Sequence, residues 1–190
     1  MDIITRFVRS SAGSDLGQLH ETLPVKPVCG VMAVPGFALY PVFRKLEARL
    51  GPIEDRSRTF PFRFSDYYRK EMGDSLEKCW VSFRMLMPPE ELSELKRFTN
   101  DLESELSVEG RRRVNLDPGY VTAAKLVLAS TKDFAHRVCL GGRIYGDVQL
   151  RYIRGAFRPS DWTYPDYSSG EALAFFTRVR ERFQTQEKKP

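Results

Sequence analysis

The stretch WVSFRMLMPPEELSELKRFTNDLESELSVEGRRRVNL, residues 80–116, contains a strand pattern, a helix pattern and a second strand pattern. Residues 80–87 alternate in polarity and predict a strand. Pro88-Pro89 followed by two glutamates is typical of a helix start, because proline tolerates the first helical turn and acids favour the positive end of the helix dipole. The predicted buried stripe of this helix consists of Leu92, Leu95, Phe98, Leu102 and Leu106. A short strand is predicted at 113–116.

The preceding residues extend this pattern toward the N-terminus. Residues 28–34 form an apolar run that predicts a buried strand. Pro41 can open a helix, and Gly51-Pro52 is a stop signal. Residues 59–64 alternate, with three phenylalanines on one side, and predict a strand near an edge because Pro61 cannot donate to a ladder. The resulting order, β-α-β-β-α-β, is the signature of a ferredoxin-like sandwich.

The C-terminal part adds a hairpin and a helix. Residues 135–140 and 144–152 are strand-like runs around Gly141-Gly142, and a loop at these two glycines would place His136 opposite Asp147. Ser168 and Glu171 have the spacing of a capping box before an amphipathic helix. We therefore predict an α+β fold with a ferredoxin-like core extended by a C-terminal β-hairpin and helix. The predicted organisation is a flexible extension at 1–25, one domain at 26–184 and a polar tail at 185–190.

Composition restricts the class of protein. The chain has 190 residues, of which 42% are hydrophobic and 29% charged, as in ordinary globular domains. No window approaches the roughly 20 apolar residues that a membrane span requires, which predicts no membrane association. Cys29, Cys79 and Cys139 lie far apart without a C-x-x-C spacing, which predicts reduced thiols and a cytoplasmic location.

Positive charge is concentrated in the C-terminal half. The formal net charge is +5, while residues 109–160 contain ten Lys or Arg against four acids, a balance of +6. Such a segment can attract phosphate-bearing ligands such as a nucleotide or RNA. A solvated surface explains the same excess.

The segment Asn115-Leu116-Asp117-Pro118-Gly119-Tyr120 predicts a type II turn, with Pro and Gly at the positions that such a turn prefers. In a functional interpretation, the turn would present Asn115 and Asp117 in a cleft beside Arg112 or Arg113. The structural interpretation needs no ligand.

Two further segments carry candidate side chains. The segment SDYYRKEMG at 65–73 contains Asp66, Tyr67 and Tyr68 in an irregular connection between strands, where sites are often built. The segment DWTYPDY at 161–167 offers Trp162, Tyr164 and Tyr167 as stacking surfaces for bases or sugars. Both sets of aromatic side chains can equally cover a core edge.

Catalytic chemistry has one candidate group. His136 opposite Asp147 could act as an oriented general base, although a cross-strand ion pair explains it as well. An oxygen-rich magnesium or manganese site using Asp66, Asp117, Asp161 or Asp166 is an alternative, but no spacing assembles such acids. The sequence has no phosphate-binding G-x-x-x-x-G-K-[ST] loop and no G-x-G-x-x-G motif after a strand.

Four segments in order, FPFRFSDYYRKEMG, RRRVNLDPGY, KLVLASTKDFAHRVCLGGRIY and WTYPDY, resemble a family of bacterial proteins known as domain-of-unknown-function family 4416. The resemblance covers residues 25–183. Some members carry an automatic label of GTP-binding protein. Thr131-Lys132-Asp133 does not reproduce the N-K-x-D guanine-recognition pattern, so the residues do not support that label. The resemblance implies no site residues.

Three functions remain open. The first is a module that binds a phosphorylated ligand, a nucleotide or RNA. The second is a metal-dependent hydrolase or phosphoryl-transfer enzyme using Asp66, Asp117 and His136. The third is a structural domain that binds a protein partner. Neither a cofactor nor a bound metal can be specified from the sequence. The predicted ligand-binding residues are Tyr67, Tyr68, Arg112, Arg113, Asn115, Tyr120, Lys125, Lys132, Trp162 and Tyr164.

Overall fold

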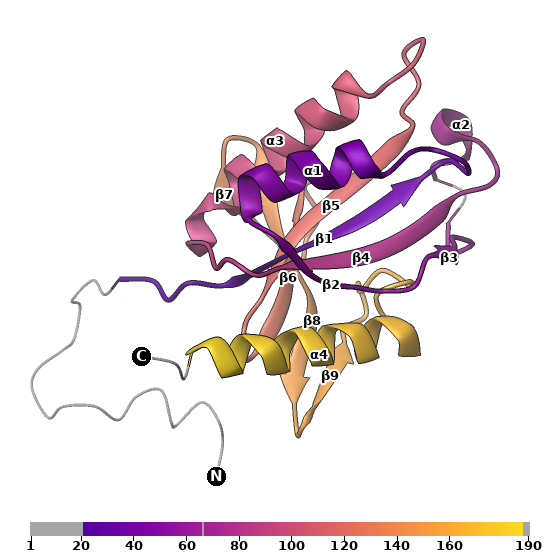
Figure 1. The fold of residues 1–190 in the computed structure, drawn as a ribbon. Helices are drawn as coiled ribbons and strands as arrows, with labels where there is room; N and C mark the ends of the chain where they lie inside the picture. Colours follow the sequence, from indigo (N-terminus) through magenta and orange to yellow (C-terminus); the bar gives the residue numbers. More distant parts are fainter. Residues whose placement is uncertain (1–20, 66, 188–190) are drawn as a thin grey trace, which may run out of the picture.

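The computed structural model describes residues 21–65 and 67–187 (Figure 1). The predicted extension at 1–25 lies for the most part outside the described residues. The elements in chain order are β1 (Lys26–Ala33), α1 (Tyr40–Leu50), β2 (Ile53–Arg56), β3 (Phe60–Pro61), α2 (Arg69–Met72), β4 (Glu77–Phe83), the 3-10 helix η2 (Pro89–Glu91), α3 (Leu92–Glu105), β5 (Val114–Val121), β6 (Lys125–Ser130), β7 (Arg137–Gly141), β8 (Ile144–Ile153), β9 (Ala156–Pro159) and α4 (Gly170–Glu187).

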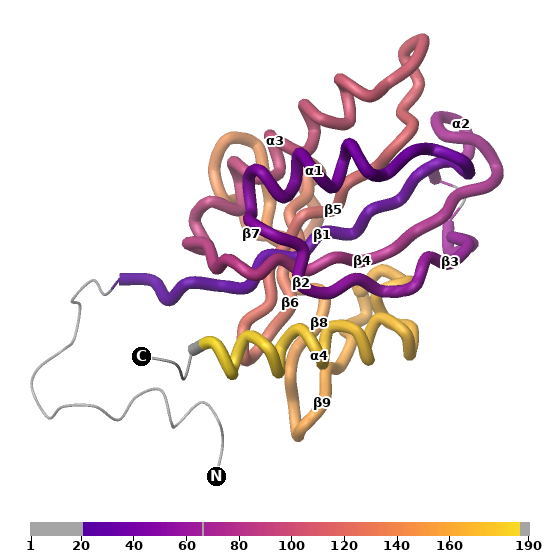
Figure 2. Tube along the Cα trace, in the orientation of Figure 1, coloured from indigo at the N-terminus to yellow at the C-terminus, as the bar shows by residue number. Residues whose placement is uncertain are grey.

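All nine strands of the described chain belong to one antiparallel sheet, ordered β2-β4-β1-β5-β6-β8-β7, with β3 paired to β4 and β9 to β8. Helices α1 and α3 lie together on one side of the sheet, and α4 lies on the other (Figures 1 and 2). The fold is therefore α+β. Helix α1 buries Val42, Leu46 and Leu50, whose spacing places them on one helical face.

Two apolar clusters hold these layers together. One contains Leu46, Leu95 and Leu102 from the helices together with strand residues such as Cys29 and Val31. The second lies on the α4 side of the sheet. Its members include the large, fully buried side chains of Trp80, Tyr167, Phe175 and Phe176.

Several predicted strands have different bounds. The phenylalanine-rich strand predicted at 59–64 is confined to Phe60–Pro61, and Phe64 is 40% exposed. Strand β4 ends at Phe83, so Met85 lies beyond the sheet and is 60% exposed. Strand β2 was not predicted because its sequence, IEDR, is too short and too polar to show alternation.

The predicted type II turn at 115–120 is wrong, because these residues lie inside β5. Pro118 pairs with Cys29 of β1, and pairing with β6 starts only at Gly119. A proline is tolerated where it has a ladder partner on one side only. A Cβ on Gly119 would lie 2.3 Å from the Val127 carbonyl oxygen, so glycine allows β6 to approach β5 closely at this point.

The predicted β7–β8 hairpin has a different turn and register. Gly141 pairs with Ile144, so the two loop residues are Gly142 and Arg143, both with positive φ (57° and 64°). A β-bulge between Cys139 and Gly141 then shifts the register, and Asp147 pairs with Arg137 rather than with His136.

The ends of the described chain are attached to the sheet. Val25 pairs with Met87 in an isolated bridge, one residue before β1 begins. Helix α4 is capped by Ser169, whose hydroxyl accepts from the Ala172 N–H, rather than by Ser168 as predicted. The helix continues to Glu187, past the predicted start of the tail at 185. None of the described helices is long and apolar enough to cross a membrane.

Candidate functional site

The sheet splits between β5 and β6. The two strands pair over Gly119–Val121 and diverge beyond that point, so β5 loses its partner at Pro118. Side chains from α3 take the place of the missing strand. The Glu103 carboxylate accepts the Leu116 N–H at 2.6 Å, and the Lys96 ammonium donates to the Leu116 carbonyl at 2.8 Å. Both backbone groups are therefore satisfied without a neighbouring strand, and the gap remains open.

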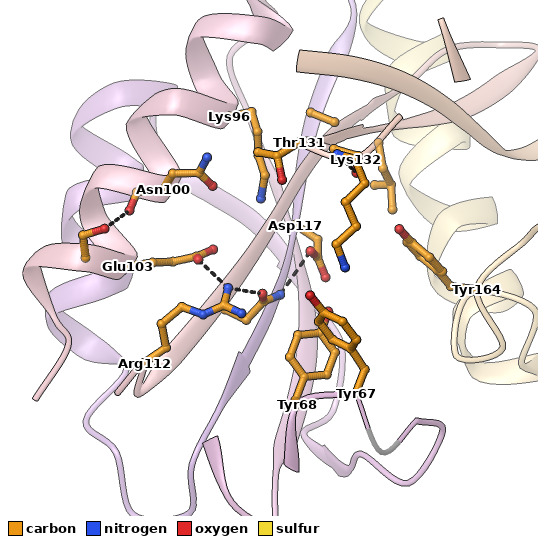
Figure 3. Close-up of a pocket in the computed structure, with 15 residues that line it drawn as sticks. Tyr67, Tyr68, Lys96, Asn100, Glu103, Arg112, Asp117, Thr131, Lys132 and Tyr164 are labelled. Atoms are coloured by element: carbon orange, nitrogen blue, oxygen red, sulfur yellow. Dashed lines mark hydrogen bonds and ion pairs between the residues drawn. The ribbon is translucent and has the colours of Figure 1, made fainter. Parts of the chain in front are cut away.

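A chain of ion pairs and hydrogen bonds continues along β5 from the split. Arg112 donates two hydrogen bonds to Glu71, both at 2.6 Å, one to Glu103 at 2.9 Å and one to Asn115 at 3.0 Å. The Asn115 amide then donates to Asp117 at 3.1 Å (Figure 3). Because the guanidinium has five donors in a fixed fork, Arg112 can hold three neighbours in place at once.

Asp117 is also paired with a buried lysine, Lys78. Lys78 lies 3.3 Å from the Asp117 carboxylate and 2.7 Å from that of Asp166. Its ammonium also stands 4.7 Å from the ring centre of Tyr167. Two carboxylates and a ring face compensate for the burial of this charge.

The pKa values of these groups follow from burial and pairing. Burial alone would raise the pKa of Asp117, but the charges of Lys78 and Lys96 outweigh it and hold that pKa below its ordinary range. For Glu103 burial prevails, and its pKa is raised despite Lys96, the Leu116 N–H and Arg112. Burial also raises the pKa of Tyr68. Of the two carboxylates, Asp117 is thus the one held more firmly in its charged form.

Two adjoining pockets with volumes of about 320 Å³ and 240 Å³ open at the split, and we describe them as two lobes of one cleft. Both volumes are of the order found in small-molecule sites. The polar lobe is lined by Lys96, Asn100, Glu103, Ser104, Arg112, Asn115 and residues 128–131. The aromatic lobe is lined by Phe62, Phe64, Ser65, Lys78, Phe134, Pro165 and Asp166. The wall between them consists of Tyr67, Tyr68, Asp117, Lys132 and Tyr164.

Lys132 stands at the junction of the lobes. Its ammonium lies 3.7 Å from the ring centre of Tyr67, and Figure 3 shows it pointing into the cleft. Among residues 21–65 and 67–187, no carboxylate forms an ion pair with Lys132. Lys132 therefore offers the cleft a positive charge that forms no ion pair within the described chain.

Arg137 fixes the far side of the cleft. The guanidinium donates to Asp147 at 2.8 Å, to the Ser130 hydroxyl at 2.7 Å, to the Lys132 carbonyl at 2.9 Å and to the Tyr164 hydroxyl at 2.7 Å. Arg137 is buried. It holds the loop after β6 and the segment around Tyr164 in one arrangement, and thereby positions two members of the shared wall.

The cleft contains some of the site residues that were predicted from the sequence. The ones that line the cleft are Tyr67, Tyr68, Arg112, Asn115, Asp117, Lys132 and Tyr164. Five others, Arg113, Tyr120, Lys125, His136 and Trp162, do not line it. Asp66 lies outside the described residues.

His136 packs against neighbouring side chains outside the cleft. Its ring stacks on Trp162 at 5.2 Å between ring centres, and its Nε2 lies 3.4 Å from the Asp147 carboxylate that Arg137 also binds. The described part of the chain contains no group of three or more His, Cys, Asp or Glu side chains arranged to hold a metal ion. His136 therefore contacts Trp162 and Asp147 and does not line the cleft.

Several residues that line or position the site were not predicted from sequence, among them Lys96, Glu103 and Arg137. Lys96, Thr99 and Glu103 share one face of α3 and are all buried. Their spacing of three and four residues follows the apolar stripe, so a charged pair at helical spacing beside that stripe was an available signal. Arg137 had no comparable signal, because its partners come from three separate segments.

The comparisons with known proteins support one family. No curated protein and no solved structure gives a significant match. A family model described as a domain of unknown function, DUF4416, matches residues 23–183, which include every described strand and both lobes of the cleft. The chain belongs to the DUF4416 family.

Proposed function

We propose that the cleft binds a small phosphorylated ligand with an aromatic ring system, of the mononucleotide kind. The observation that carries the proposal is the joining of an aromatic lobe to a polar lobe at Lys132. A nucleotide has the same two parts, a flat ring system and a charged phosphate, connected at a similar junction.

The polar lobe supplies cations for the phosphate. Arg112 is already bound by Glu71 and Glu103, so it has little charge to offer. Lys132 lacks a carboxylate partner in the described chain, and Lys96 donates to a backbone carbonyl rather than to an acid. Two lysine ammoniums can together form charge-assisted hydrogen bonds to phosphate oxygens.

The aromatic lobe supplies ring faces for a base. Phe64 is 40% exposed although it lines a concavity, which leaves part of its ring available. Phe134 is 52% exposed, and its ring also contacts Arg137 and His136. Stacking of a base on an aromatic side chain contributes about 1–3 kcal/mol. Asp117 and Tyr164 in the shared wall can accept or donate hydrogen bonds at the ring edge.

The two alternatives have less support. The hydrolase hypothesis requires His136 beside Asp117, and His136 does not line the cleft. A partner-binding domain would not need a concave site in which buried charges are arranged around a lysine that forms no ion pair within the described chain.

A thermal-shift comparison of matched ligands tests the proposal. Each nucleoside is compared with its monophosphate and with inorganic phosphate. A ligand at about 100 times its Kd stabilises a protein by about 2.7 kcal/mol, or roughly 5–10 °C at this chain length. We expect one or more monophosphates to raise the melting temperature and the matching nucleosides to do so weakly.

Two variants locate the binding. Lys132→Met keeps the aliphatic stem and removes the charge, and it should weaken monophosphate binding about 10- to 100-fold. Arg58→Met removes a positive charge from an exposed surface position outside the cleft and should leave binding unchanged. Equal affinity of wild type and Lys132→Met would refute the proposed site.

We also infer that residues 26–121 are a ferredoxin-like unit. The strand order β2-β4-β1-β5, with α1 and α3 on one side, supports this inference. The short β3 and α2 between β2 and β4 depart from the simple pattern. Superposition of an experimental structure on ferredoxin-like domains would test it, and a left-handed β1-α1-β2 connection would contradict it.

We assign this function to the cytoplasm. The three cysteines are unpaired thiols, of which Cys29 and Cys79 are buried. Free thiols are typical of reducing compartments, where mononucleotides are also available. Exclusive recovery of the native protein from an extracytoplasmic fraction would contradict the assignment.

A further inference from the structure

Three cations form a row across the sheet at the end remote from the cleft. Lys125 of β6 pairs with Arg151 of β8, and Arg151 pairs with Arg158 of β9. Directly opposite residues of neighbouring strands point to the same face. All three side chains are exposed.

The row lies on the face that α4 does not cover. Leu126 and Leu150 are opposite each other and buried in the cluster against α4. Side chains alternate along a strand, so Lys125 and Arg151, the next residues, point to the other side. Phe157 is likewise buried beside α4, which places Arg158 with the other two cations.

The proximity of these three cations is unfavourable, and the described residues provide no acid to compensate it. Like charges directly opposite each other on neighbouring strands are destabilising. None of the ion pairs within 21–65 and 67–187 neutralises the three cations. Residues 122–159 contain seven Lys or Arg and two acids, Asp133 and Asp147, and Asp147 is bound by Arg137. Such a row favours an external anion.

The row continues onto a projecting hairpin. Strands β8 and β9 are joined by a tight turn at Arg154-Gly155, with φ values of 50° and 82°. The turn extends beyond α4, and its tip is the lowest point of the coloured chain in Figure 1. Arg154 is exposed at this tip. The two-stranded tip thus carries Arg154 away from the body of the protein, while Arg151 and Arg158 lie at its base beside Lys125 of β6.

We propose that this basic hairpin, Lys125, Arg151, Arg154 and Arg158, binds the phosphate backbone of double-stranded DNA. Arginine forks match phosphate oxygens, and the major groove of B-form DNA admits a two-stranded β-ribbon. Single-stranded nucleic acid is recognised largely by stacking on aromatic rings. The nearby Tyr152 is not available for such stacking, because it packs against Phe157 on the α4 side. This surface is separate from the cleft and does not depend on its proposed ligand.

Fluorescence anisotropy with a labelled DNA duplex of about 20 base pairs tests the proposal over a range of salt concentrations. The logarithm of the association constant should fall linearly with the logarithm of salt, by about 0.9 per phosphate contact. The variant combines Lys125→Gln, Arg151→Gln, Arg154→Asn and Arg158→Gln, with asparagine at 154 because it tolerates positive φ. We expect its salt slope to be smaller in magnitude by roughly 2 to 4.

A matched control keeps the test specific. Arg44→Gln, Arg58→Gln, Arg63→Gln and Lys70→Gln together remove the same four charges from exposed positions elsewhere. This control should retain the wild-type slope, and so should the cleft variant Lys132→Met, whose nucleotide binding is tested separately. Circular dichroism and thermal melting establish that each variant is folded.

Three outcomes would overturn the proposal. The first is an equal slope for the hairpin variant and the matched control. The second is loss of DNA binding in Lys132→Met, which would assign the binding to the cleft. The third is tighter binding to a single-stranded RNA of the same length, or to vesicles containing anionic lipid, than to the DNA duplex.

Discussion

At the scale of single residues, Leu116 explains why the cleft exists. Its N–H and carbonyl would face an empty ladder position if α3 did not supply Glu103 and Lys96. An unpaired buried backbone group costs about as much as a lost hydrogen bond. The charges on α3 therefore stabilise the split in the sheet as well as lining the polar lobe.

Glu103→Ala tests this role. The substitution leaves the Leu116 N–H without an acceptor and removes one partner of Arg112, so we expect the free energy of unfolding to fall by about 3 kcal/mol. Glu105→Ala, on the same helix as Glu103, removes an exposed glutamate that pairs with Lys45 of α1 and should cost less than about 1 kcal/mol. Denaturant titration measures both. Equal losses would show that Glu103 does not support β5.

The pH dependence of stability tests Asp117. Its pKa in the folded protein lies below the ordinary value of 3.8, so its contribution to stability is present above about pH 4 and is lost as the pH falls through the lowered pKa. Asp117→Asn lacks this contribution. The difference in unfolding free energy between wild type and variant should be large at about pH 7 and shrink at about pH 3. A difference independent of pH would contradict the assignment.

Single-residue chemistry could be predicted from the sequence only where side chains lie close together along the chain. Tyr67 and Tyr68 were recognisable because they are adjacent in a short polar connection. Asn115 and Asp117 were recognisable for the same reason, although the turn predicted to carry them does not exist. Arg137 was not, since its role comes from contacts with segments up to 27 positions away along the chain.

At the scale of elements, the split between β5 and β6 is the feature that makes the site. The strands approach closely at Gly119 and separate at Pro118, where the missing N–H ends the ladder. Glycine and proline thus have opposite effects at neighbouring positions. The same dipeptide is typical of turns, which is why local sequence preference indicated a turn and tertiary pairing produced a strand.

Gly119→Ala tests the close approach. The added Cβ would meet the Val127 carbonyl oxygen at 2.3 Å, and backbone on both strands would have to move. We expect a loss of about 1–3 kcal/mol in the free energy of unfolding. Gly170→Ala, at the first position of α4 with nothing near the added Cβ, is the matched control and should be neutral or stabilising. An unchanged stability for Gly119→Ala would contradict the packing described here.

Helices were the more predictable elements. The apolar spacing of α1 and α3 repeats over several turns, and it marks their buried faces whatever the strands do. The short strand β2 has too few residues to show alternation, and β3 covers only two of the six residues whose alternation predicted a strand. The β7–β8 register depended on a bulge that adds one residue to one strand, and nothing in the local sequence specified it.

At the scale of the whole molecule, one sheet carries two surfaces of different character. The cleft at the β5–β6 split is concave, and most of its charges are paired, whereas the basic hairpin projects and its cations are unpaired among the described residues. The first suits a small ligand and the second an extended polyanion. Separate variants can therefore test the two proposals.

A crystal structure with the tightest-binding mononucleotide from the thermal-shift panel tests the central claim most directly. Our account predicts the base in the aromatic lobe among Phe62, Phe64 and Phe134, and the phosphate beside Lys132 and Lys96. A nucleotide bound outside the cleft, or one whose phosphate points away from Lys132, would contradict it.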